Sequence, residues 1–120
     1  MISFSCRVFY LILLYLIFPL KLYAQDWHLA GTRGIMNFVV VSKEREADKD
    51  VYLEAIQSIC KVGENCKIIF WASADHVPTS WPMTDAQRES RVVDYFKEGN
   101  SEEEKFLWNC RIVNDPSQCF

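Results

Sequence analysis

The chain has little glycine and histidine, with 4 Gly and 2 His among 120 residues. No Gly-rich phosphate-binding loop is present, and neither Ser73 nor Ser80 has the flanking glycines of a nucleophile elbow. The sequence also lacks a C-x-x-C motif, the usual signature of thiol–disulfide exchange. These absences argue against nucleotide binding by a phosphate loop, hydrolysis by a serine on a nucleophile elbow, and thiol–disulfide exchange.

Residues 1–24 have the composition of an export signal. They contain no acidic residue, carry Arg7 near the start and continue with the apolar run 8–20. A cut after Ala24 would leave residues 25–120 as a single small domain. The alternative is an uncleaved anchor, but the apolar run is shorter than the roughly 20 residues that cross a bilayer. We therefore predict an exported protein, periplasmic or secreted, which contacts a membrane only through this segment if it stays attached.

The remainder of the chain is acidic. Removal of Arg7 and Lys21 with the signal lowers the number of Lys plus Arg from 13 to 11, against 16 Asp plus Glu, which leaves a net charge of −5. Nucleic-acid binding needs a basic face, and the sequence indicates none, so we expect no nucleic-acid partner. The charge runs 43–50 and 101–105 are typical of solvated surface.

Four cysteines remain after the signal, an even number in an exported chain of fewer than 100 residues, which predicts two disulfides. Sequence alone allows three pairings. We favour the two local ones, because each closes without a long search: Cys60–Cys66 and Cys110–Cys119. The rival interpretation is a four-thiolate zinc site, but the C-x5-C and C-x8-C spacings are wider than those of zinc knuckles. We expect neither a metal nor a cofactor.

The first half of this region reads as a strand, a helix and a second strand. Residues 35–42 and 66–72 are apolar runs, as strands covered on both faces would be. Between them, residues 48–61 carry apolar side chains at helical spacing, at Val51, Tyr52, Ala55, Ile56, Ile59 and Cys60. Because strand–helix–strand crossovers are almost always right-handed, we expect the two strands to be parallel.

A second helix is predicted to begin at Thr84. Gln87 lies three positions later, which is the pattern of a capping box. An apolar stripe then continues until Gly99 stops the helix, and it consists of Val92, Val93 and Phe96.

Residues 101–113 fit either a helix or a strand. A helix would leave Trp108 and Ile112 in water, so we favour a strand, which alternation supports at Phe106, Trp108, Cys110 and Ile112. Residues 25–34 have no clear pattern and are expected to be an irregular lead-in. Residues 114–120 are expected to form a turn-rich tail that Cys119 folds back.

These elements predict a small α/β fold. We expect a single-layer sheet of β-α-β-α-β order with at least one parallel strand pair, two helices packed on it and two disulfides. Ligands of open α/β sheets gather beyond the carboxyl ends of the parallel strands. The polar residues that follow the predicted strands, or start the next helix, are Ser42, Lys43, Ser73, Asp75, His76 and Thr84. A small anion could bind among them.

The same residues also have a structural interpretation. Asp and Ser are common turn residues, and the Thr84 hydroxyl is committed to its helix cap. Asp75 and His76 are sequence neighbours, which seldom point at each other, so we do not favour catalytic roles for Ser73, Asp75 or His76. Trp81 is expected to be a lid over the core, and Trp71 part of the core, rather than a stacking platform.

Two functions of different classes follow. The first is a small exported binding or accessory module that contacts another envelope or extracellular protein. Its size, acidity, disulfides and lack of a catalytic set support it. The second is a small hydrolase or anion-binding protein that uses the 73–84 edge, with Ser42, Lys43, Trp81 and Thr84 as ligand-binding candidates. We favour the first and expect no enzyme.

Overall fold

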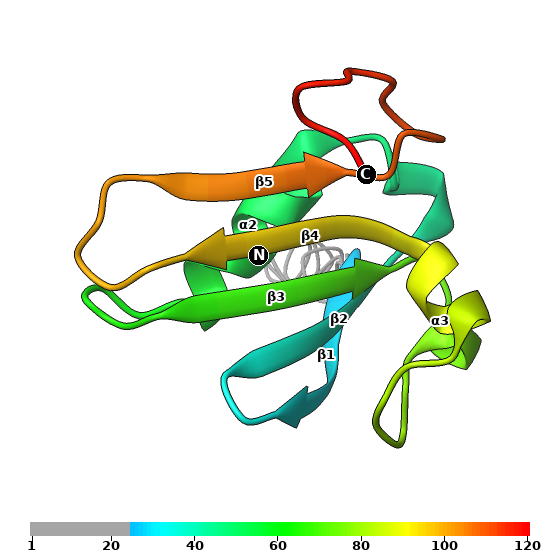
Figure 1. The fold of residues 1–120 in the computed structure, drawn as a ribbon, viewed down its shortest axis with the longest axis horizontal. Helices are drawn as coiled ribbons and strands as arrows, with labels where there is room; N and C mark the ends of the chain where they lie inside the picture. The colour runs from blue at the N-terminus through cyan, green and yellow to red at the C-terminus, as the bar shows by residue number, and fades with distance from the viewer. Residues whose placement is uncertain (1–24) are drawn as a thin grey trace, which may run out of the picture.

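The computed structural model describes residues 25–120, so the predicted export signal lies outside the described residues. Within this range the chain forms one sheet with two α-helices (Figure 1). In chain order the elements are β1 Trp27–Arg33, β2 Met36–Val41, α2 Lys49–Ile59, β3 Cys66–Trp71, α3 Asp85–Glu89, β4 Arg91–Lys97 and β5 Glu104–Trp108.

The strands lie in the sheet in the same order as in the sequence, from β1 to β5. β1 and β2 form an antiparallel hairpin, and α2 connects β2 to the parallel strand β3. β4 and β5 continue the sheet as antiparallel neighbours. The small α/β fold with a parallel pair is thus confirmed. The predicted β-α-β-α-β order is not, because β1 and β4 add two strands to it.

Helix α2 begins where its sequence favours a start. The Asp48 side chain accepts a hydrogen bond from the Asp50 backbone N–H at 3.0 Å, which caps the helix. The apolar face of α2 then packs on the sheet and centres on Tyr52, whose ring meets three others edge to face: Phe70, Phe106 and Trp108. This face of the sheet, behind the strands in Figure 1, holds the larger part of the core.

The opposite face of the sheet carries a smaller apolar cluster of Phe38, Ile69 and Trp71. Trp71 is fully buried, and its indole N–H donates a hydrogen bond to the Gln87 carbonyl of α3 at 2.8 Å. Val77 and Met83, from the segment between β3 and α3, pack on the same cluster. This segment therefore acts as a structural connection that closes one end of the second face.

The second predicted helix is wrong beyond its first turns. The Thr84–Gln87 capping box forms, but α3 ends at Glu89 and the chain continues as β4. Val93 pairs with Phe70 of β3, and Val92 and Val93 are fully buried. β-branched residues suit a strand, and β4 satisfies backbone groups along β3 that a helix would leave without partners.

The expectation of an irregular lead-in is also wrong. Residues 27–33 form β1, joined to β2 by a turn in which Gly34 takes a positive φ of 58°. That conformation strains any residue with a Cβ and suits glycine. The strand prediction for residues 101–113 is confirmed over Glu104–Trp108, and the helical alternative is rejected.

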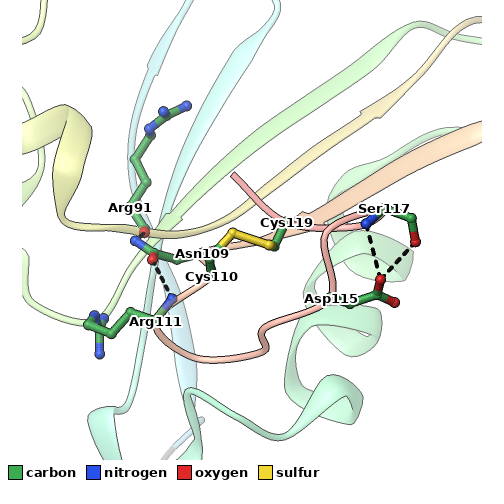
Figure 2. The surroundings of a disulfide bond; sticks show 7 residues. All are labelled: Arg91, Asn109, Cys110, Arg111, Asp115, Ser117 and Cys119. Atoms are coloured by element: carbon green, nitrogen blue, oxygen red, sulfur yellow. Dashed lines mark hydrogen bonds between the residues drawn. A yellow bond between two sulfur atoms is a disulfide. The ribbon is translucent and has the colours of Figure 1, made fainter.

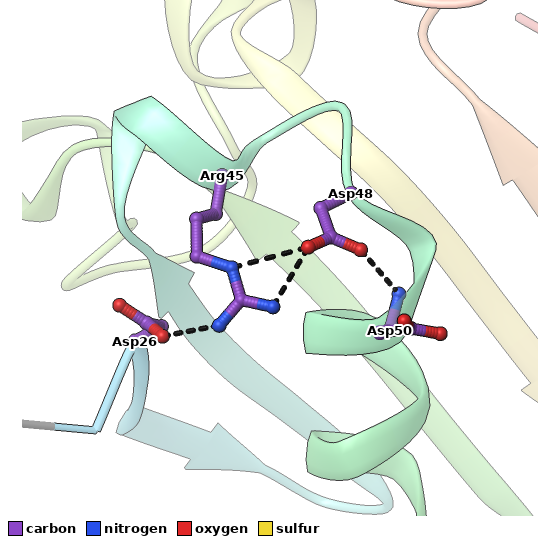
Figure 3. Close-up of polar contacts among 4 residues, drawn as sticks. All are labelled: Asp26, Arg45, Asp48 and Asp50. Carbon is purple, nitrogen blue, oxygen red and sulfur yellow. Dashed lines mark hydrogen bonds and ion pairs between the residues drawn. The ribbon is translucent and has the colours of Figure 1, made fainter. Parts of the chain in front are cut away.

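A charged clamp holds the start of β1 against the segment before α2. The Arg45 guanidinium bonds to the carboxylates of Asp26 and Asp48, and the contact to Asp48 measures 2.7 Å (Figure 3). Asp48 is the residue that also caps α2. The clamp thus couples the first strand to the position of the helix.

Both predicted disulfides are present. Cys60–Cys66 joins the end of α2 to the start of β3. Cys110–Cys119 folds the tail back (Figure 2). Cys119 also forms an isolated β-bridge with Trp108. Two disulfides in a small domain are typical of an oxidising environment outside the cytosol. Neither helix within residues 25–120 has the length and apolar character needed to cross a membrane.

Candidate functional site

A small pocket of about 230 Å³ lies at the carboxyl edge of the parallel strands β2 and β3. We call it the edge pocket. Four separate segments contribute to its wall: those that follow β2, β3 and β5, and the junction of α3 with β4. The lining residues are Lys43, Glu46, Ala72, Ser73, His76, Ser90 and Arg111.

Local hydrogen bonds fix the segments of this pocket. The Ser73 hydroxyl accepts from the backbone N–H of Asp75 at 3.3 Å and so caps the short turn that carries His76. On the other side, Asn109 donates to the Arg91 carbonyl at 2.8 Å and accepts from the Arg111 N–H at 2.9 Å (Figure 2). The backbone that carries Arg111 is therefore tied to β4.

Glu46 and Arg111 form an ion pair at the edge pocket, with Arg111 Nη1 and Glu46 Oε1 3.4 Å apart. The Arg111 side chain is 55% exposed and the Glu46 side chain only 17%. Below them the Tyr52 hydroxyl donates to the Glu46 carbonyl at 2.6 Å. Burial, and secondarily the Glu46 charge, raise the pKa of Tyr52, so this phenol stays neutral.

Two polar atoms near this pocket are buried without a hydrogen-bond partner among the described residues. They are Glu46 Oε2 and the hydroxyl of Ser42. A buried acceptor without a donor costs free energy, and such atoms are uncommon in folded proteins. The polar network on this side of the pocket is therefore incomplete.

The structure brings together three of the residues that the sequence placed at this edge: Lys43, Ser73 and His76 line the same pocket. Asp75 and Thr84 do not line it. Thr84 is occupied by its capping box, in which its hydroxyl accepts from the Gln87 N–H at 3.1 Å. The hydroxyl of Ser42 is buried rather than presented to the pocket.

Sequence reasoning missed Glu46, Ser90 and Arg111. Glu46 lies within a charge run that reads as solvated surface. Ser90 and Arg111 reach the pocket only because β4 and β5 extend the sheet beyond β3. Arg111 lies in the turn after β5, so a correct count of strands was the signal that could place it here.

A second hollow, of about 300 Å³, lies between β1 and the segment before α3; we call it the Trp81 groove. In Figure 1 the β1–β2 hairpin and the loop before α3 both lie below β3. One wall is Ala30–Arg33 of β1, the other is Pro78–Trp81, and Phe38 forms part of the lining.

Trp81 covers the smaller core cluster only in part. Its ring lies parallel to that of Phe38, with the centroids 6.4 Å apart, yet 38% of the residue stays exposed. The Arg33 guanidinium lies 5.6 Å from the centre of the indole ring. Trp81 thus presents aromatic surface and an adjacent cation to solvent.

In the part of the chain that the structure describes, the side chains of Ser73, Asp75 and His76 make no hydrogen bonds with one another. Asp75 and His76 are both exposed, and Ser73 bonds only to their backbone N–H groups: its hydroxyl accepts from Asp75 and its carbonyl accepts from His76. Within residues 25–120 no three His, Cys, Asp or Glu side chains are grouped to hold a metal ion. No protein-family model, curated protein or solved structure matches the chain. The geometry of these sites is therefore the basis for a functional proposal.

Proposed function

We propose that this protein is an exported binding module that acts by contact with another protein, and that the Trp81 groove is its docking surface. The observation that carries the proposal is the exposed indole of Trp81 beside the outer strand β1. Tryptophan is enriched among the residues that dominate interface energies, and Arg33 supplies a second residue of that kind.

The expected occupant is an extended segment of the partner that carries an acidic side chain. Within residues 25–120 no strand pairs with the outer edge of β1, and an extended peptide can add to such an edge through backbone hydrogen bonds. Arg33 is the charged residue in the lining of the groove, so an acidic group on the partner would complement it. Trp81 would then cover an apolar side chain of the same segment.

The partner would share the compartment of this chain. Two disulfides and the predicted export signal support a periplasmic or secreted location. In that setting an acidic, disulfide-bonded module could act as an inhibitor, an immunity-type protein or an accessory subunit.

The test begins with the exported chain, tagged at its C-terminus and cross-linked in intact cells. A partner identified in this way is purified and titrated against the wild-type chain and its variants. Trp81→Ala should weaken the complex by about 2 kcal/mol, roughly thirtyfold in Kd, and Arg33→Gln should weaken it less.

The matched control is Leu53→Ala, which removes a comparably exposed apolar side chain on α2, away from the groove. This variant should bind as the wild type does. The proposal fails if no partner is captured, or if Trp81→Ala and Leu53→Ala bind with the same affinity.

A further inference from the structure

We propose that the edge pocket binds a small zwitterion, with the chemistry of a free α-amino acid. Its residues are not shared with the Trp81 groove, so this site is separate from the proposed docking surface. The inference rests on charges of both signs that the segments after β2 and β5 bring into one small hollow.

The cationic groups come first. Lys43, which follows β2, and Arg111, which follows β5, both line the pocket. His76, which follows β3, adds an imidazole. Residues 25–120 carry more acidic than basic residues, so a pocket with this lining is unusual for the chain. Arg111 is more than half exposed and pairs through one nitrogen only, so its other donors remain available to a carboxylate.

The anionic group is Glu46. Its Oε1 faces Arg111, and its Oε2 is buried without a donor among the described residues. A small rotation of this carboxylate would let it accept from an ammonium group in the pocket, which would replace the missing hydrogen bond. A simple anion could bind Lys43 and Arg111 but would leave Glu46 Oε2 without a donor, whereas a ligand that carries both charges would satisfy the cations and the carboxylate.

The size of the pocket narrows the ligand further. Its volume of about 230 Å³ is below the roughly 300–1,000 Å³ of drug-sized sites, so it suits a molecule of a few heavy atoms. An α-amino acid separates its ammonium and carboxylate groups by one carbon atom. The carboxylate would bind Arg111 and Lys43, and the ammonium would bind Glu46.

The test uses three ligands of nearly the same size: L-alanine, propionate, which lacks the ammonium group, and L-alaninamide, which lacks the carboxylate. Each is titrated up to about 10 mM into the isotope-labelled exported chain, a range that detects weak complexes. Alanine should shift the amide signals of residues 73, 76 and 111, and should bind at least tenfold tighter than either analogue.

Variants distinguish the site from non-specific binding. Arg111→Gln should weaken alanine binding at least tenfold, and Glu46→Gln should weaken alanine and alaninamide but not propionate. Arg88→Gln is the control, because Arg88 is exposed and pairs with Asp85 outside the pocket. A melting curve of each variant verifies that it is folded.

Three results would overturn the inference: no binding of alanine in this range, propionate binding as tightly as alanine, or equal affinities for Arg111→Gln and Arg88→Gln. None of these results depends on a protein partner. Failure of the zwitterion site would therefore leave the Trp81 groove untouched, and the reverse also holds.

Discussion

The two outer strands of the sheet differ in how their edges are protected. Along β5 the edge carries Glu104 and Lys105, and its end is covered by the tail, where Trp108 N–H donates to the Gln118 carbonyl at 2.9 Å. Along β1 the only Lys, Arg, Asp or Glu is Arg33, and within residues 25–120 nothing pairs with its outer side. A bulge between Leu29 and Gly31 interrupts its regular pairing with β2.

This difference indicates which edge is available to a partner. Proteins block sheet edges with charges, short strands, bulges or covering segments, because a free edge invites pairing with other chains. β5 has both charges and a cover, and the cover is fastened by a disulfide. β1 has only the bulge, and its residues 31–33 remain regular beside the Trp81 groove. The open edge and the exposed indole thus lie together.

The largest expected effect comes from removing the disulfide that closes the β5 edge. The double variant Cys110→Ser, Cys119→Ser should lower the free energy of unfolding by about 2–3 kcal/mol, since the bond closes a short loop. The tail should also detach from β5. Denaturant unfolding measures the first effect, and hydrogen exchange at the amides of Trp108 and Phe120 measures the second.

The matched control is Cys60→Ser, Cys66→Ser, which opens a loop of similar length far from β5 in the sequence. It should cost a similar free energy and leave exchange at Trp108 close to that of the wild type. If both double variants expose Trp108 equally, the tail is held by global stability and not by its own disulfide.

A smaller effect is expected at the other end of β5. The Tyr95 hydroxyl donates to Glu104 Oε2 at 2.7 Å and so links β4 to the edge strand. Burial, and then this hydrogen bond, raise the pKa of Tyr95 above its ordinary value of about 10. Its contribution to stability is therefore complete below about pH 10 and is lost as the pH rises toward the folded-state pKa.

Tyr95→Phe should cost about 1 kcal/mol at neutral pH and reduce the loss of stability in alkali. Part of that loss should remain, because burial raises the pKa of Tyr52 as well. Urea unfolding between about pH 8 and 11 measures both effects, a range that includes the ordinary tyrosine pKa. An unchanged alkaline slope in Tyr95→Phe would show that this phenol does not couple to folding.

At the start of β1 the clamp should respond to acid. Hydrogen bonds from Arg45, and then from the Asp50 backbone, hold the pKa of Asp48 below its usual range. The stabilisation is present above the unfolded pKa of about 4 and is lost as the pH falls through the folded-state pKa. Asp48→Asn should flatten this acid slope while the amide still caps α2. Melting curves of Asp48→Asn and Arg45→Gln at acidic pH should show the same reduced dependence of stability on pH. If both variants lose stability with falling pH as steeply as the wild type, the clamp is contradicted.

The sequence predicted β2, α2, β3 and β5 correctly and missed β1 and β4, for a physical reason in each case. The structure of residues 35–72 is determined by local features of the sequence: two apolar strands, a capped amphipathic helix and a local disulfide. β1 is exposed on both faces beyond Trp27 and contains a bulge, so its alternation is weak, although Trp27 and the turn at Gly34 were a usable signal. β4 was hidden because its apolar residues also fit a helical stripe, and only pairing with β3 decides between the two.

The residues of the candidate site also divide into those that the sequence could place and those that it could not. Lys43, Ser73 and His76 could be placed at one edge because β2 and β3 were correctly read as parallel. Arg111 could not be placed, because its position depends on β4, β5 and the turn at Asn109. Trp81 was expected to be a lid over the core, but 38% of the residue is exposed. Its exposure depends on the distance between its loop and Phe38, and the sequence pattern gives no such distance.

The smallest expected effect on stability tests the open edge most directly. Thr32 is exposed on β1 and lines the Trp81 groove, so Thr32→Glu would give β1 a charge like that of Glu104 on β5. The free energy of unfolding should change by no more than about 0.5 kcal/mol, because the side chain is at the surface. Binding of the acidic partner segment should weaken, since a like charge would lie beside it.

Thr32→Lys is the matched control for that variant. It places a side chain of similar length at the same position of β1 but with the charge that complements an acidic segment, so it should bind more tightly than Thr32→Glu. Kd values for both variants, measured with the partner identified by cross-linking, decide the question. If Thr32→Glu binds as the wild type does, the partner does not use the β1 edge, and the contrast with β5 concerns folding alone. If both charges weaken binding equally, the partner still adds to this edge, but it does so without the acidic group proposed to face Arg33.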